Sequence, residues 1–423
     1  DFSSLTNAGF GTSINLGGAD FGSLINSGGS ATINLNGADF SSLVNVGFGA
    51  SIDLGGAKFS TLLNGITGWD GADFSTLISS DIGAGATINL NGADFTSLIN
   101  VGANTTINLG GADFGSLVGS IGDINLGGAN FDSLMNSGTG VTINLAGADF
   151  STLTGSIGNI NLGGADFTSL TNTGGGVTIN LGGADFSSLQ GDLNGTIHLG
   201  GAEFDSLINT GGGVTINLGG ADFSSLQGDL SGTINLGGAD FTSLTNTGIG
   251  VTINLGGADF SSLTGSVGDI NLGGADFTSL TNTGGGVTIN LGGADFSSLQ
   301  GDLSGTVNLA GADFDSLINA GAGVTINLGG ADFSSLQGDL SGKIDLGGAT
   351  FTQFGNSGED VVLNLAGADF SSLTGSIGDI NLGGADFDSL INVGSGVTIN
   401  LGGADFSSLQ GDLNGTINLG GAD

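Results

Sequence analysis

The residue that could most often do chemistry in this chain is an aspartate placed directly before a phenylalanine. The Asp-Phe pair returns mostly every 17 to 19 residues. If successive copies stack, neighbouring carboxylates about 4.8 Å apart repel each other by roughly 0.9 kcal/mol in water. Such a row favours cations, protons or hydrogen-bond donors. Its members are Asp20, Asp39, Asp94, Asp113, Asp149, Asp166, Asp185, Asp222, Asp240, Asp259, Asp276, Asp295, Asp313, Asp332, Asp386 and Asp405.

Three interpretations of this acidic row compete. Its side chains could accept hydrogen bonds from turn N–H groups beside the Gly-Gly pairs and keep a glycine-rich surface soluble. They could bridge calcium, which prefers oxygen ligands, or they could form a proton-sensitive ladder. An obligate metal at every copy disagrees with the exceptions in the row, Lys58, Asn130, Glu203 and Thr350. We therefore expect no required cofactor, with calcium as the candidate cation.

The composition offers little for catalysis. The chain has one histidine, His198, and no cysteine, tyrosine or arginine, so the usual general bases, thiol nucleophiles and anion clamps are missing. His198 stands where other copies carry an exposed asparagine, and we expect an exposed substitution there. The formal net charge of -37 excludes nucleic acid as a direct partner. The sequence therefore predicts a protein that is not an enzyme.

The elements that position the aspartates follow from the repeat itself. One phrase, typified by I-N-L-G-G-A-D-F, occurs 23 times between Phe2 and Phe406. Alternation of apolar and polar residues within each copy predicts two short strands around a glycine turn. Self-similarity at this period predicts a parallel β-solenoid of about 23 stacked coils of 17–19 residues, with glycine-rich turns. The expected core ladder contains Phe21, Phe40, Phe59, Phe114, Phe150, Phe186, Phe223, Phe260, Phe296, Phe333, Phe370 and Phe406.

Other regularities support the same fold. The chain has 90 glycines and no proline, as expected if turns need positive φ and every strand N–H joins the ladder. Coil lengths alternate, which indicates a unit of two coils with two kinds of connector. Asn217 and its equivalents form a second outward row, which we expect to be an amide ladder that stabilises parallel stacking.

The chain reads as one continuous array over residues 1–423. The spacing of the copies falls to 15 and then rises to 21 near residues 65–73, where Trp69 is the only tryptophan. This register defect is either a bulged coil packed by Trp69 or a docking site. Both ends lie in mid-phrase, so we expect an excerpt of a longer repeat protein or a filament that joins end to end. No apolar stretch reaches 18 residues, so no transmembrane segment is expected.

Two resemblances add to this interpretation. The residues Ile-Asn-Leu-Gly-Gly-Ala-Asp-Phe-Ser-Ser resemble two units of the pentapeptide-repeat family, with its A-(D/N)-(L/F)-x-x consensus and quadrilateral β-helix. The match covers a little over half of each coil. Some acidic members of that family imitate DNA and bind topoisomerases. Glycine-rich coils of this length are also similar to the β-solenoid shafts of secreted bacterial adhesins and matrix filaments.

These observations together favour a mechanical role. We expect an extracellular structural fibre or adhesin shaft, secreted to a bacterial surface or biofilm matrix, that associates with itself axially and laterally and binds divalent cations as candidate bridging ions. The alternative is an acidic DNA mimic, similar to pentapeptide-repeat proteins, that binds a topoisomerase.

Overall fold

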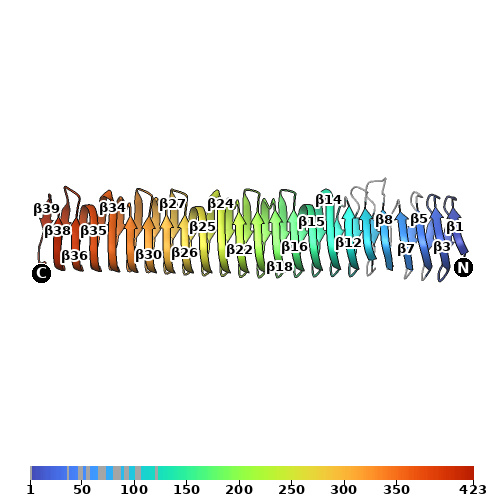
Figure 1. The fold of residues 1–423 in the computed structure, drawn as a ribbon, viewed down its shortest axis with the longest axis horizontal. Coiled ribbons are helices and arrows are strands. Elements are labelled where there is room, and N and C mark those ends of the chain that lie inside the picture. Colours follow the sequence, from blue (N-terminus) through green and yellow to red (C-terminus); the bar gives the residue numbers. More distant parts are fainter. Residues whose placement is uncertain are drawn as a thin grey trace. The chain divides into compact units, whose positions relative to one another are not determined.

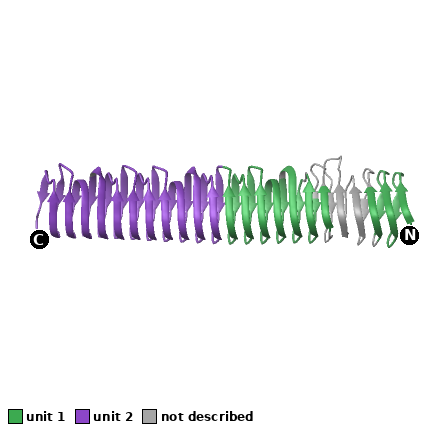
Figure 2. Ribbon diagram, in the orientation of Figure 1, with its two compact units in different colours: residues 1–211 green, residues 212–423 purple. Residues whose placement is uncertain are grey.

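The chain folds into two compact units of β-structure. The computed structural model describes residues 2–35, 38–45, 51–53, 58–64, 73–79, 87–89, 95–100, 106–119 and 122–423. The units are Asp1–Gly211 and Gly212–Asp423 (Figure 2). Each unit is by itself an all-β parallel solenoid (Figure 1). The turns number about 19, slightly fewer than the 23 coils expected. One continuous array over 1–423 stays a prediction.

Each coil contributes two strand segments, which we call the phenylalanine strand and the T-I-N strand. In the first unit the phenylalanine strands are β1 (Phe2–Asn7), β3 (Asp20–Asn26), β5 (Asp39–Asn45), β7 (Lys58–Asn64), β8 (Asp73–Ser79), β10 (Phe95–Asn100), β12 (Asp113–Gly119), β16 (Asp166–Asn172), β18 (Asp185–Gly191) and β20 (Glu203–Asn209). The T-I-N strands are β2 (Ser13–Asn15), β4 (Thr32–Asn34), β6 (Ser51–Asp53), β9 (Thr87–Asn89), β11 (Thr106–Asn108), β13 (Ile124–Asn125), β17 (Val177–Asn180) and β19 (Gly195–His198). Both segments run together in β14 (Asn130–Asn144) and β15 (Asp149–Asn161).

The second unit repeats this arrangement. Its phenylalanine strands are β22 (Asp222–Gly228), β26 (Asp276–Asn282), β28 (Asp295–Gly301), β30 (Asp313–Asn319), β32 (Asp332–Gly338), β36 (Asp386–Asn392) and β38 (Asp405–Gly411). Its T-I-N strands are β21 (Val214–Asn217), β23 (Gly232–Asn235), β27 (Val287–Asn290), β29 (Gly305–Asn308), β31 (Val324–Asn327), β33 (Gly342–Asp345), β37 (Thr398–Asn400) and β39 (Thr416–Asn418). The joined strands are β24 (Asp240–Asn254), β25 (Asp259–Asn271), β34 (Thr350–Asn364) and β35 (Asp369–Asn381).

Strands of one type pair in parallel with the same type one coil further on. In the pair of β22 with β24, Phe223 lies opposite Phe241, and Leu226 lies opposite Leu244. The same residue types face each other whether the copies are 17, 18 or 19 residues apart, because length differences fall in the connectors. Like residues therefore form columns that run from coil to coil.

A tight turn joins each T-I-N strand to the following phenylalanine strand. In the turn Leu236-Gly237-Gly238-Ala239, the Ala239 N–H donates to the Leu236 carbonyl at 2.9 Å, and Gly238 has φ of 69°. Positive φ at the third residue is typical of a type II turn, which favours glycine there. The preceding position is less restricted, and Ala310 occupies it in another coil. The expectation that glycines supply positive φ at the turns is thus confirmed.

The core consists of apolar columns. In one coil of the second unit, Ile234, Leu236, Ala239 and Leu244 are fully buried, and Phe241 is 6% exposed. A connector residue such as Leu230 completes the coil's interior. Because each coil is only two strands wide, its apolar side chains stay partly uncovered unless the coils before and after it pack against them.

The segment with irregular spacing is described only in part. Strands β7 and β8 pair with Phe59 opposite Phe74, and β8 pairs with β10 with Phe74 opposite Phe95. The flanking strands thus keep the common register across steps of 15 and 21 residues. Trp69 and the rest of 65–72 lie outside the described residues. In the part of the chain that is described, no helix is long and apolar enough to cross a membrane.

Candidate functional site

The acidic row lies on the outside of the phenylalanine strands. Each predicted aspartate that the structure describes is exposed, and Asp94 lies outside the described residues. The columns are in register, with Asp240 opposite Asp259 and Asp259 opposite Asp276. The exceptions occupy the same column: Glu203 lies opposite Asp185, and Thr350 lies opposite Asp332. The aspartates thus form a row of exposed carboxylates in register from coil to coil.

The turn N–H groups beside the Gly-Gly pairs have other partners than these aspartates. Gly273 N–H donates to Asn271 Oδ1 at 3.4 Å, and Gly329 N–H donates to Asn327 Oδ1 at 3.2 Å. The asparagine of the T-I-N strand thus takes the role that one interpretation gave to the aspartate. Among the described residues, no group of three or more potential ligands is arranged to hold a metal ion. Calcium bridging stays a prediction.

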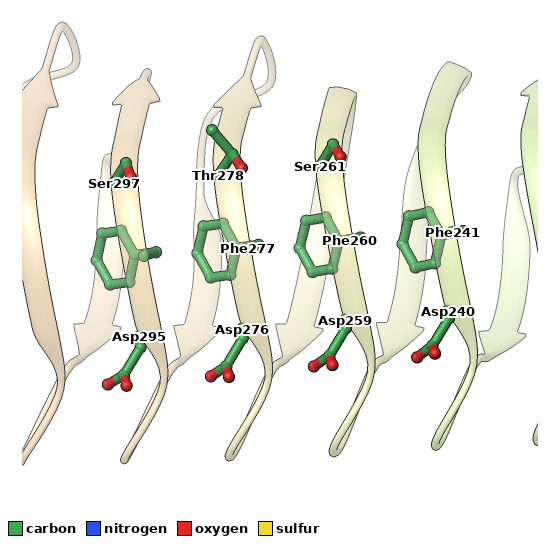
Figure 3. Close-up of a pocket in the computed structure, with 11 residues that line it drawn as sticks. Asp240, Phe241, Asp259, Phe260, Ser261, Asp276, Phe277, Thr278, Asp295 and Ser297 are labelled. Atoms are coloured by element: carbon green, nitrogen blue, oxygen red, sulfur yellow. The ribbon is translucent and has the colours of Figure 1, made fainter.

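An open groove follows the acidic row along four coils of the second unit (Figure 3). Asp, Phe and Ser or Thr succeed one another along each strand, and residues of one kind line up from strand to strand (Figure 3). The groove has a volume of about 620 Å³. A similar groove begins at Asp295 and Phe296 and continues along the next coils. The same chemistry thus recurs coil after coil instead of converging on one centre.

Phenylalanine rings form a stacked column next to the acidic row, on the buried side of the same strands. Phe241, Phe260 and Phe277 have ring centroids 4.9 and 4.8 Å apart, with interplanar angles of 1° and 2°. Every member of the predicted core ladder whose side chain is described is buried, except the half-buried Phe406. The side chain of Phe59 lies outside the described residues. Parallel rings at strand spacing add an attraction beyond area burial.

A row of amides runs along the T-I-N strands. Asn235 Nδ2 donates to Asn217 Oδ1 at 2.8 Å, and Asn254 Nδ2 donates to Asn235 Oδ1 at 2.9 Å. In both bonds the later coil donates to the earlier one. The predicted amide ladder is confirmed. His198 takes a ladder position opposite Asn180, and its side chain is exposed, as expected.

A second set of asparagines is buried, and the sequence analysis missed it. Asn246 is 4% exposed and makes four hydrogen bonds. Its Oδ1 accepts from Leu230 N–H at 3.1 Å and Gly248 N–H at 2.9 Å, and its Nδ2 donates to Gly248 O at 3.0 Å and Ser266 O at 2.8 Å. Because an amide has two donors and two acceptor lone pairs, this one is fully satisfied. It joins its own coil to the coils before and after it.

These buried amides alternate with glycine through the second unit. Gly228 lies opposite Asn246, which lies opposite Gly265, and Asn282 lies opposite Gly301. The predicted unit of two coils is therefore confirmed for the second unit. This strict alternation of Asn and Gly at one position of the repeat was the sequence signal that could have revealed the buried amides.

The stacked carboxylates predict a salt effect on stability. Raising NaCl from about 0.01 M to 1 M shortens the Debye length from about 30 Å to 3 Å, so repulsion along the row falls. We expect the melting temperature to rise with NaCl. Calcium bridging predicts a further rise with CaCl₂ at matched ionic strength, reversed by chelation. A melting temperature that ignores NaCl would contradict the repulsion argument, and equal effects of the two salts would remove calcium bridging.

Comparison with known proteins adds no family to these observations. No protein-family model matches the chain, and no curated protein matches it.

Proposed function

We propose that this chain is the shaft of an extracellular structural fibre or adhesin, working at a bacterial surface or in a biofilm matrix. The observation that carries the proposal is that each kind of interaction in the units repeats from one coil to the next. Phenylalanine stacking, the outward amide ladder and the buried amides all join neighbouring coils. Repetition without a convergent site suits a part whose work is mechanical.

The mechanism is resistance to separation of neighbouring coils. Parallel ladders place backbone hydrogen bonds between coils. The side-chain amides of Asn246 and Asn254 also donate hydrogen bonds to a neighbouring coil. A force that separates coils must break these bonds and also expose a phenylalanine ring and four smaller apolar side chains. Axial and lateral self-association of such shafts would extend the fibre. The proposal gives the chain no catalytic role.

The DNA-mimic alternative has support from the exposed carboxylates and the net charge of -37. The spacing of the charges favours the fibre over the DNA mimic. Successive phosphates of one DNA strand rise by about 3.4 Å along the helix axis, whereas the strands that carry the acidic row repeat at the 4.8 Å seen between phenylalanine rings. A topoisomerase surface that fits phosphates would lose register with the row within a few coils.

Single-molecule pulling tests the mechanical role. With the chain held at both ends, we expect stepwise extension, because coils detach one or two at a time. One coil of about 18 residues releases roughly 60 Å of extended chain, and a unit of two coils releases roughly 120 Å. One cooperative event at low force would contradict the proposal.

Two further assays separate the alternatives. Negative-stain electron microscopy of the native material should show long filaments of uniform width if the chain is a fibre. Discrete particles that inhibit a topoisomerase in a DNA-relaxation assay would favour the DNA mimic. A charge-matched polyaspartate serves as the control, because non-specific inhibition by polyanions would be equal for both.

A further inference from the structure

One strand position of the first unit is apolar through seven successive coils. The column is the position directly after the leucine that follows each phenylalanine by three residues. Strand pairing places its members opposite one another without interruption, from Thr6 at one end to Thr154 at the other. The members between these threonines, which we call the apolar column, are Ile25, Val44, Leu63, Ile78, Ile99, Val118 and Met135.

The described side chains of the apolar column face solvent. Ile25 is 40% exposed, Val118 is 37% exposed and Met135 is 55% exposed. Val44 and Ile99 are half-buried. The largest apolar patch on a soluble monomer typically covers about 300–600 Å², and such patches often bind something.

The fold does not require apolar residues in this column. Further along the first unit it holds Thr171 and Gln190, and Gln190 Nε2 donates to Thr171 Oγ1 at 3.2 Å. In the second unit Ile318 stands alone between Gln300 and Gln337. Polar and apolar residues are thus both compatible with the strand pairing, and the run of seven needs another explanation.

We propose that the apolar column is the surface through which two copies of this chain associate side by side. A straight column of like residues is complementary to its own copy, which is what a two-fold interface requires. The residue directly after each phenylalanine belongs to the same strand as the column member, and over the first six coils it is small and uncharged: Gly22, Ser41, Ser60, Ser75, Thr96 and Gly115. Two copies can therefore approach closely there.

Charge favours this location as well. The chain has only two basic residues, and one of them, Lys58, replaces an aspartate of the acidic row in the strand that carries Leu63. Asn130 replaces another in the strand that carries Met135. Repulsion between two acidic copies is therefore lower along this segment than where the row is complete.

The size of the column sets the expected strength. Six strand spacings of about 4.8 Å give a length of about 29 Å, and a width of about 10 Å gives roughly 300 Å² on each copy. This lies in the range of weak, transient contacts. One pair of columns should associate at micromolar concentrations, and several pairs along two fibres should hold by avidity.

Sedimentation velocity of the full chain tests the proposal. We expect the wild type to dimerise at about 10–100 µM. A triple variant combines Ile25→Thr, Val118→Thr and Met135→Thr. Its dimer dissociation constant should be at least tenfold higher than that of the wild type. Threonine already occupies this column elsewhere, so the variant should keep its far-UV circular dichroism. Ile318→Thr is the matched control and should change the constant less than twofold.

Two results would overturn the proposal: a wild type that stays monomeric at about 100 µM, the upper end of the expected range, or a triple variant that dimerises like the wild type. The inference extends the proposed function, since a fibre gains strength by bundling. Electron microscopy distinguishes a failure of the fibre proposal from a failure of the column interface. Bundles that become single filaments in the triple variant support both ideas. Dimers without any filament refute the fibre and keep the column interface, whereas filaments unaffected by the column refute only the interface.

Discussion

Replacing Gly301 by alanine is expected to separate β26 from β28 and open the coils on both sides. Gly301 has φ of 125°, and an added Cβ would lie 1.9 Å from Asn282 O and 2.8 Å from Asn282 C. Both are backbone atoms of the neighbouring strand, so relief requires breaking the ladder. Strain of about 1–2 kcal/mol and overpacking of about 1–3 kcal/mol predict a total cost of about 2–5 kcal/mol.

Two other glycines provide graded controls for this substitution. Gly274 has φ of 68° but open space around its Cβ position, so Gly274→Ala should cost only the strain of about 1–2 kcal/mol. Gly273 would meet atoms no closer than 3.7 Å, and Gly273→Ala should be nearly neutral. Hydrogen exchange gives the local opening free energy in each variant. Equal losses of protection in Gly301→Ala and Gly274→Ala would refute the crowding argument.

The repeat alone was sufficient to predict the fold. Phe223 lies opposite Phe241 because each copy carries the same alternation and the same turn, so only the in-register pairing buries every apolar face. The acidic row and the amide ladder follow from the same alternation, since Asp222 and Asn217 stand at outward positions. The sequence supplies these columns because they depend only on residues within one copy and on translation between copies.

The buried amides could not be predicted in that way. Asn246 follows a buried leucine by two residues, and its connector neighbours are polar, so it resembles an exposed loop residue. Its burial depends on the path of the connector, and its partners Leu230 and Ser266 come from two other coils. The exposed apolar column was visible in the sequence, but its continuity became clear only when pairing across the steps of 15 and 21 residues was established.

Substituting Asn246 by alanine is expected to destabilise three coils at once. The change leaves the N–H groups of Leu230 and Gly248, and two carbonyls, without their partner in a buried place. An unsatisfied buried group costs about 1–3 kcal/mol, and partial rehydration of the connector limits the sum, so we expect a loss of about 3–5 kcal/mol. Hydrogen exchange at Leu230 and Gly248 should accelerate by the corresponding factor, while amides several coils away keep their protection.

The matched control is Asn254→Ala in the outward ladder. That change removes a half-buried bond of 2.9 Å to Asn235, worth about 0.5–1.5 kcal/mol. Asn246→Asp adds a second test, because it keeps the acceptor but turns a carboxylate oxygen toward Gly248 O and Ser266 O. The stability of Asn246→Asp relative to Asn246→Ala should fall as pH rises. The protonated carboxyl still donates one hydrogen bond, whereas the ionised carboxylate donates none. Equal stability of Asn246→Ala and Asn254→Ala would show that the buried amide does not stabilise the contact between coils more than the outward amide does.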